Sequence, residues 1–390
     1  MIGIKTCRNL SLFLAVVFLV SLALPSETSH ARRRRYKLPT HPVVLWSRTI
    51  SRSKDLEQRR VAAFKLSQYS QRLFQSSVID TLTSCVRDPD IQIRVFCVKA
   101  LGNTGNKRSD SIRRVLLDRF KTDPEVKSTV VRTFLKRRDD SLVVHDTLLK
   151  SLMGTNDTEF SLSLLSYFEE LGSGSTGFVN SLVQRYAKET DPAIKQSIVK
   201  SLTNTGRGQN NLIQLITQCA QDNDSALAIT CLSGIEAQAK NDPRSLAAVE
   251  KNLMKNDNDI LNASLDVLLE LPEKTNVIIS NRLLSIVEDA KDPEILEKSV
   301  LALGPTGDKS SKIIARLIKL LNDEKAYEAV RIASALSLGQ QGINQFDDVT
   351  KELSGCQKLA PSQNFKTACQ IGLEDLMNQR QSSSEQKSPT

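Results

Sequence analysis

The chain has 390 residues, of which 40% are apolar and 25% charged, and its formal net charge at pH 7 is +9. This length fits either two or three ordinary domains or one elongated array of repeats. Aromatic residues make up only 5% of the chain, so it offers few surfaces for base stacking, and nucleic acid is a poor candidate partner.

The first 31 residues have the pattern of a secretory signal peptide. Lys5 and Arg8 precede an apolar run at residues 10–24, and the small residues Ser29 and Ala31 fit cleavage after Ala31. The run of about 15 residues is shorter than the roughly 20 that span a bilayer. The sequence therefore predicts an exported protein, periplasmic if the source is Gram-negative and otherwise extracellular. The alternative is an uncleaved membrane anchor.

A basic arm is predicted at residues 32–50, and it begins with four arginines at 32–35. Residues 32–140 contain 26 Lys and Arg against 11 Asp and Glu, whereas residues 141–390 contain 25 against 32. This asymmetry favours an anionic partner at the N-terminal end: an acidic protein, lipid headgroups or an anionic envelope polymer. A solvated surface with a disordered basic arm explains the same charges, and this alternative stays open.

One pentapeptide recurs every 101 residues, as LGNTG at 101–105, LTNTG at 202–206 and LGPTG at 303–307. Because 101 is close to three times 34, a shorter unit underlies this repeat. Each unit starts with Asp, often followed by Pro, and then has apolar residues three and four apart, as in a helix.

We expect the Asp to cap the first helix of each unit, and the Gly of LGNTG to end that helix in the left-handed conformation. Each unit is then a helical hairpin. The predicted caps are Asp88, Asp123, Asp157, Asp191 and Asp292.

Asp-Pro, then Val or Ile with Arg or Lys, then Ala-Leu-Gly at 34-residue spacing resembles HEAT-type repeats, close to the short bacterial kind. The resemblance implies an all-α fold, an α-α superhelix (HEAT-like solenoid) of about nine to ten helical hairpins at residues 51–377. A tetratricopeptide array has the same period, but its Trp, Gly-Tyr and Pro pattern is missing, and Trp46 lies outside the units. The polar residues 378–390 are expected to form a disordered tail.

Six cysteines remain after the signal peptide, and they fall into three local pairs. Packed helices lie about 8–10 Å apart, so cysteines four units apart are too distant for a disulfide, which needs Cα atoms within about 7 Å. Cys85 lies at the base of its hairpin, whereas Cys97 is roughly 12 Å along an ideal helix from Asp88. Even a local disulfide therefore requires an irregular connection or a steep helix crossing. Free cysteines in equivalent core positions remain the alternative. The pairs are Cys85 with Cys97, Cys219 with Cys231, and Cys356 with Cys369.

The sequence offers little for catalysis. His41 and His145 are the only histidines after residue 31, and the common hydrolase, zinc-protease and P-loop motifs are missing. GSGSTG at 172–177 matches the dinucleotide-binding pattern G-x-G-x-x-G, but it follows a helical stretch rather than a strand. We therefore expect no catalytic residue, no cofactor and no metal.

In HEAT-like proteins the second helices usually line the concave side, and this expectation selects the cations on two of them. They are candidates for contact with an acidic protein partner, although a solvated helix face would have the same pattern. The leading hypothesis is a non-catalytic exported scaffold that binds a protein through the solenoid surface. The alternative is a binder of an anionic polymer or membrane surface through the basic N-terminal end. The candidate contact residues are Arg113, Arg114, Lys121, Lys312, Arg316 and Lys319.

Overall fold

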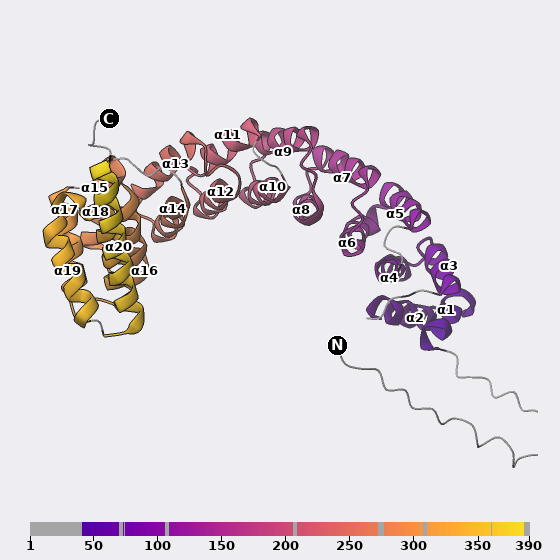
Figure 1. Ribbon diagram of the computed structural model, residues 1–390. Coiled ribbons are helices and arrows are strands. Elements are labelled where there is room, and N and C mark those ends of the chain that lie inside the picture. The colour runs from indigo at the N-terminus through magenta and orange to yellow at the C-terminus, as the bar shows by residue number, and fades with distance from the viewer. Residues whose placement is uncertain are drawn as a thin grey trace, which may run out of the picture. The chain divides into compact units, whose positions relative to one another are not determined.

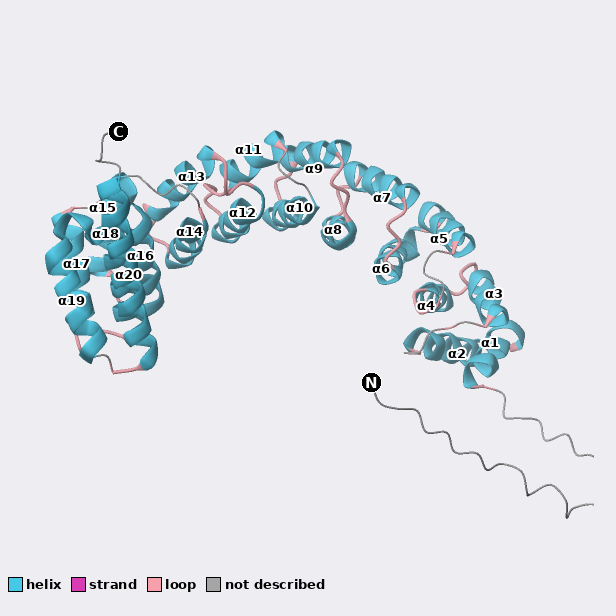
Figure 2. Ribbon diagram, viewed as in Figure 1, coloured by secondary structure: helices cyan, strands magenta, loops and turns pink. Residues whose placement is uncertain are grey.

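The computed structural model describes residues 41–69, 73, 75–105, 109–205, 209–271, 277–306, 310–359 and 361–385. The predicted signal peptide and residues 32–40 of the predicted arm lie outside this part. The chain divides into two units, residues 1–42 and 43–390, and the helical array forms the second. The described residues form α-helices and short 3₁₀ turns, with no β-strand among them (Figure 2).

The helices are α1 Pro42–Arg52, α2 Leu56–Gln68, α3 Ser76–Cys85, α4 Ile91–Leu101, α5 Asp110–Thr122, α6 Lys127–Arg137, α7 Leu142–Gly154, α8 Thr158–Leu171, α9 Thr176–Lys188, α10 Pro192–Thr205, α11 Asn210–Cys219, α12 Ser225–Gln238, α13 Pro243–Leu253, α14 Asn258–Glu270, α15 Val277–Asp289, α16 Pro293–Leu303, α17 Ser311–Asn322, α18 Glu328–Gln341, α19 Phe346–Leu359 and α20 Gln363–Glu385. The 3₁₀ turns are η1 Pro124–Val126, η2 Gly304–Thr306 and η3 Gly342–Gln345.

Odd- and even-numbered helices alternate along the chain, and from α3 onward each odd-numbered helix packs against the even-numbered helix that follows it. Contacts are extensive between α3 and α4, and likewise between α11 and α12, whereas α4 and α5 make few. The Asp-Pro turn therefore lies inside a hairpin, and LGNTG links two hairpins, which is the reverse of the predicted arrangement. The architecture is nevertheless the expected all-α, HEAT-like solenoid, with ten helix pairs in the described part of the chain.

The helices form two layers, one of even-numbered and one of odd-numbered helices (Figure 1). Even-numbered neighbours pack closely on one another, as α8 does on α10, while odd-numbered neighbours such as α7 and α9 touch little. The even-numbered layer thus lies on the inner side of the bend in this unit. The expectation that α5 and α17 line the inner side is wrong, because the helices that follow the Asp turns line it.

Aspartates begin most even-numbered helices, because a carboxylate accepts hydrogen bonds from N–H groups that have no partner within the helix. In α4 this residue is Asp90, which accepts from the backbone N of Ile93 at 3.0 Å. Asp88, the predicted cap, instead accepts from the N of Asp90 and pairs with Arg59 of the preceding hairpin. The other predicted caps accept backbone N–H groups at N···O distances of 2.9–3.3 Å: Asp123 at η1, Asp157, Asp191 and Asp292.

The pentapeptide ends its helices differently from the expectation. Gly102 follows α4 with φ −64°, which is right-handed, so the left-handed closure is not used there. In the second copy α10 continues through LTNT to Thr205. The only non-glycine residue with positive φ in the described part is Arg138, at 50°, after α6.

Side chains near the C-terminal ends of several even-numbered helices donate hydrogen bonds to the end of the preceding even-numbered helix. The last carbonyls of a helix have no donor within it, and the next hairpin supplies one. Donor and acceptor lie 3.0–3.1 Å apart in these pairs: Asn103 and Ser67 O, Arg137 and Leu101 O, Asn204 and Glu169 O, Gln341 and Gly304 O, and Gln379 and Gly339 O.

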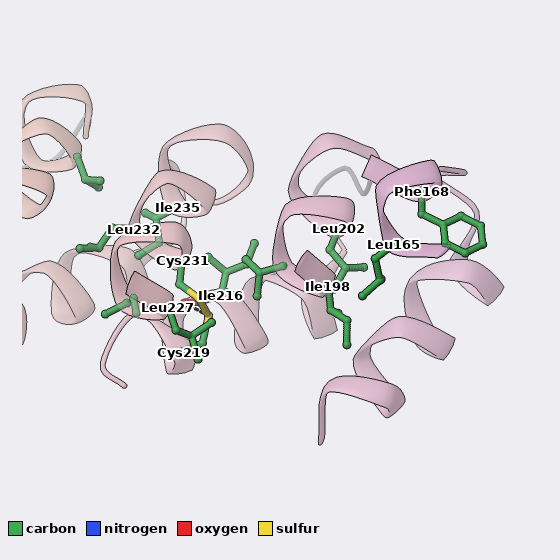
Figure 3. Packing of buried hydrophobic residues seen from close by; sticks show 14 of the residues in the cluster. Leu165, Phe168, Ile198, Leu202, Ile216, Cys219, Leu227, Cys231, Leu232 and Ile235 are labelled. Atoms are coloured by element: carbon green, nitrogen blue, oxygen red, sulfur yellow. Dashed lines mark hydrogen bonds between the residues drawn. A yellow bond between two sulfur atoms is a disulfide. The ribbon is translucent and has the colours of Figure 1, made fainter. Parts of the chain in front are cut away.

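Buried apolar residues fill the space between the layers and form one continuous core. Figure 3 shows a part of it, in which Ile198 and Leu202 of α10 lie between α8 and the pair α11–α12. This continuity explains the stability of the array, since a single hairpin cannot bury its apolar face alone.

Three disulfides join helices within hairpins, with Cα–Cα distances of 5.9–6.1 Å. They link Cys85 to Cys97, Cys219 to Cys231 and Cys356 to Cys369, in the second, sixth and tenth helix pairs. The sequence placed Cys97 too far along its helix to reach Cys85, but the helix starts later than predicted, at Ile91. Cys97 then lies about 9 Å from the helix start rather than 12 Å.

Both ends of the array extend beyond the predicted repeats. Residues 42–50 of the predicted arm belong to α1, where Val43 and Ile50 are buried and the Trp46 ring meets that of Tyr69 at 6.1 Å. At the other end α20 continues to Glu385, so residues 378–385 are helical and not the predicted disordered tail. Among the described helices, none is both long and apolar enough to span a bilayer.

Candidate functional site

An exposed apolar patch lies on the inner layer at the N-terminal end of the array. In α2 the buried residues are Ala62, Ala63, Leu66 and Ser67, which pack against the neighbouring helices. Val61 and Phe64 lie on the other side, with 50% and 47% of their surface exposed. The ring of Phe64 meets that of Phe96 on α4 edge-to-face, with centroids 5.4 Å apart, so aromatic surface covers the seam between the two helices.

Two exposed cations without a carboxylate partner in the described residues follow on α4 and α6. Lys99 follows Phe96 by three residues and thus shares its side of α4. Arg132 occupies the exposed side of α6, opposite the buried Phe134. Neither makes an ion pair within the described residues. We call Val61, Phe64, Phe96, Lys99 and Arg132 the N-terminal inner patch.

The arginines around this patch are already paired. Arg60 donates from Nε to Asp90 at 3.2 Å, and its hydrogen bond holds the pKa of Asp90 below the usual range. Arg94 lies 2.8 Å from Asp123 in the next hairpin. These pairs join successive even-numbered helices.

The inner layer has the opposite charge further along the chain. Asp259, Asp266 and Glu270 are exposed on α14, and α16 adds Glu294 and Glu297. Lys298 Nζ is the cation in their midst, 2.6 Å from Asp266 and 2.8 Å from Glu294. Hydrogen bonds from Lys298 and Asn262 hold the pKa of Glu294 below its ordinary value. The inner layer is therefore basic and apolar near α4 and acidic near α14.

The cations selected from the sequence lie on the odd-numbered layer, in two groups that the structure does not bring together. Arg113 Nε donates to both carboxylate oxygens of Asp139, at 3.0 and 2.9 Å. Arg316 donates to the carbonyl of Val287 at the end of α15, at 2.8 Å. Both therefore hold neighbouring helices together. The other four are exposed on α5 and α17: Arg114, Lys121, Lys312 and Lys319.

A buried polar cluster joins α6, α7 and α8. Asp139 is 1% exposed, and its carbonyl accepts a hydrogen bond from the Tyr167 hydroxyl at 2.6 Å. Burial raises the pKa of Tyr167 and lowers that of His145, whose ring lies 5.4 Å from the tyrosine ring. Arg137, also buried, donates to the carbonyl of Leu101. These contacts fix the positions of the helices relative to one another.

Cofactor and metal sites find no support in the described residues. No group of three or more His, Cys, Asp and Glu side chains there is arranged to hold a metal. GSGSTG forms the link between α8 and α9, with a helix and not a strand before it. A Cβ on Gly174 would lie 2.7 Å from the carbonyl O of Thr205, so this glycine permits close packing against the end of α10.

These features define the class of protein as a HEAT-like α-solenoid whose exposed side chains are divided between an inner and an outer layer. No protein-family model matches the sequence, and no curated protein matches it.

The structure is similar to solved structures of the karyopherin Kap121p. The complex with the SUMO protease Ulp1p gives a TM-score of 0.51 at 13% identity, over 88% of this chain and 43% of that one. The complex with the extreme C-terminus of the protein phosphatase Cdc14p gives 0.51 at 12%, over 88% and 44%. This chain thus spans less than half of the karyopherin's length, and the similarity at this identity concerns the fold.

The N-terminal inner patch was not predicted from the sequence. Val61 and Phe64 are three residues apart, which is also the spacing of core residues. The available signal was that the stretch VAAFKL has apolar residues on both sides of its helix.

Proposed function

We propose that this protein is an exported, non-catalytic scaffold that binds another protein through the inner layer, with the N-terminal inner patch as the main contact. The observation that carries the proposal is the exposure of Val61 and Phe64 beside Phe96 on a closely packed helix layer. Exposed aromatic and aliphatic side chains that cluster on a rigid surface are typical of interaction sites.

Two further observations support the proposal. The Kap121p structures are complexes with protein partners in the cases of Ulp1p and the Cdc14p C-terminus, and the present chain has the same kind of fold. Export is supported by the signal-like residues 1–31 and by the three disulfides, since disulfides persist mainly in oxidising compartments.

The alternative, an anionic polymer bound at the basic end, is less well supported. Many cations of residues 41–140 are engaged inside the array, among them Arg59 with Asp88, Arg60 with Asp90 and Arg113 with Asp139. The net charge of this segment therefore overstates the cationic surface available to a polymer.

Site-specific crosslinking tests the proposal. A photoreactive phenylalanine analogue replaces Phe64 in the full-length protein, made in its own source organism. The matched control carries the analogue at Val143, an apolar residue of the odd-numbered helix α7 that is 59% exposed. We expect a discrete protein adduct from position 64 and none from position 143. No adduct at position 64, or the same adducts at both positions, would contradict the proposal.

A further inference from the structure

The N-terminal inner patch combines two kinds of surface on three adjacent helices. Val61 and Phe64 on α2 and Phe96 on α4 provide an apolar platform. Lys99 on α4 and Arg132 on α6 then continue the inner side toward the next hairpin. A ligand that crosses the three helices therefore meets apolar surface first and positive charge next.

The positive charge in this section is not balanced by the protein itself. Asp88 and Asp90 are held by Arg59 and Arg60, and Asp123 by Arg94. Arg60 and Arg94 also pair with the exposed carboxylates of Glu57 and Glu125. Asp139 is buried and held by Arg113.

Lys99 and Arg132 are exposed, and neither pairs with a carboxylate of the described residues. Cations so placed beside an apolar platform fit a ligand with carboxylates next to an apolar side chain.

We propose, on the basis of the proposed function, that the partner contributes an acidic peptide segment with one aromatic or large aliphatic anchor. The anchor packs on Val61, Phe64 and Phe96, and the carboxylates of the segment pair with Lys99 and Arg132. The apolar contact supplies most of the affinity, because exposed ion pairs are individually weak. The charges select the partner and make its binding depend on salt.

Binding of a defined probe tests this assignment. The probe is a fluorescein-labelled peptide of about 14 residues, rich in Glu and Asp, with one central Phe. As a helix it spans about 20 Å, enough to cross three helices at the usual spacing of 8–10 Å. Two control peptides are matched to it. In the amide peptide every Glu and Asp is replaced by Gln and Asn, and in the Ser peptide the Phe is replaced by Ser. Affinity for the oxidised full-length protein is measured by fluorescence anisotropy at about 50 and 150 mM NaCl.

The decisive variants reverse the same number of charges on the two layers. We expect Lys99→Glu/Arg132→Glu to weaken binding of the acidic peptide about tenfold or more, and Arg114→Glu/Lys121→Glu on α5 less than about twofold. Phe64→Ser should weaken binding of the Phe peptide and leave the Ser peptide unchanged. Circular dichroism shows whether each variant is folded, and intact mass shows whether its disulfides are formed. The two charge variants keep Phe64, so they test the charges separately from the apolar contact.

Several results would overturn the assignment. They are the absence of binding, equal losses in the two charge variants, equal affinity for the amide peptide, or heparin binding that requires Lys99 and Arg132 but not Phe64. Crosslinking at position 64 remains a separate test: a captured segment without acidic residues refutes this inference and leaves the scaffold function standing. The absence of any protein adduct refutes the proposed function itself.

Discussion

A change of glycine to alanine at Gly339 tests how closely the last helices pack. A Cβ at this position of α18 would lie 2.5 Å from both the Cα and the carbonyl O of Gly372 on α20. These are backbone atoms, so no side-chain rotation relieves the clash and the two helices must separate. The disulfide between Cys356 and Cys369 holds α20 against α19 and limits that separation.

The magnitude follows from two opposing effects. Alanine favours the helix over glycine by about 1 kcal/mol, while overpacking a close contact costs typically 1–3 kcal/mol. We expect Gly339→Ala to destabilise the α18–α20 contact by about 1–2 kcal/mol, because the clash is between backbones. Gly355 in α19 is the matched control, since a Cβ there meets nothing within 4 Å. Gly355→Ala should stabilise by about 0.5–1 kcal/mol.

Native-state hydrogen exchange is the suitable assay, because repeat arrays open locally and do not always unfold in one step. A loss of about 1.4 kcal/mol corresponds to roughly tenfold faster exchange. We expect this loss of protection in α18 and α20 of Gly339→Ala, with helices such as α4 and α8 unchanged. Unchanged or increased protection in α18 and α20, or an equal loss in Gly355→Ala, would refute the reasoning from the Gly339–Gly372 contact.

Three further predictions concern a cap, a buried histidine and the disulfides. Asp90→Ala removes the cap of α4 and the partner of Arg60, so we expect a loss of about 1–2 kcal/mol in chemical denaturation and a smaller one for Asp90→Asn, which still caps. Because burial lowers the pKa of His145, its contribution to stability is complete above about pH 6.5 and is lost as the pH falls. Thermal unfolding should show this loss as the pH falls below about 6.5, and His145→Gln should reduce it. An equal slope in both proteins would assign the loss to other groups. Replacing Cys85 and Cys97 by Ala should cost about 2–3 kcal/mol, as should replacing Cys219 and Cys231, but only the first pair should weaken binding of the acidic peptide.

Beyond the solenoid architecture, which the 34-residue repeat predicted, the features that the sequence predicted correctly are local ones. Asp157 and Asp292 accept hydrogen bonds from residues two or three positions later, so their role depends on their own helix alone. The start of α4 shows the limit of such reasoning. Asp88-Pro89-Asp90 offers two carboxylates, and both pair with arginines of another hairpin, Asp88 with Arg59 and Asp90 with Arg60.

The pairing of helices could not be derived from the repeat. In a strictly alternating series of helices, the sequence period is the same whichever neighbour forms the hairpin, so only packing decides the pairing. The cysteines contained the missing information. A disulfide between Cys85 and Cys97 crosses the Asp-Pro turn, and this turn must then lie inside a hairpin.

Two of the six surface candidates make contacts that could not be derived from the sequence, for a related reason. Arg113 and Arg316 lie outside the apolar stripe of their helices and therefore resemble free surface cations. Their partners, Asp139 and the carbonyl of Val287, lie 26 and 29 residues away in sequence and become neighbours only through stacking. Val61 and Phe64 were missed for the opposite reason, because apolar residues at helical spacing are usually buried.

The first disulfide and the N-terminal inner patch are connected through α4. Cys97 is buried and directly follows Phe96 in α4, and its bond to Cys85 fixes α4 against α3. Phe96 touches Phe64 on α2, and Lys99 lies less than one turn further along the same helix. A rigid platform loses less conformational entropy on binding than a mobile one. The oxidised pair therefore prepares the patch for a ligand, whereas the pair in α11–α12 stabilises a part of the array that contributes no residue to it.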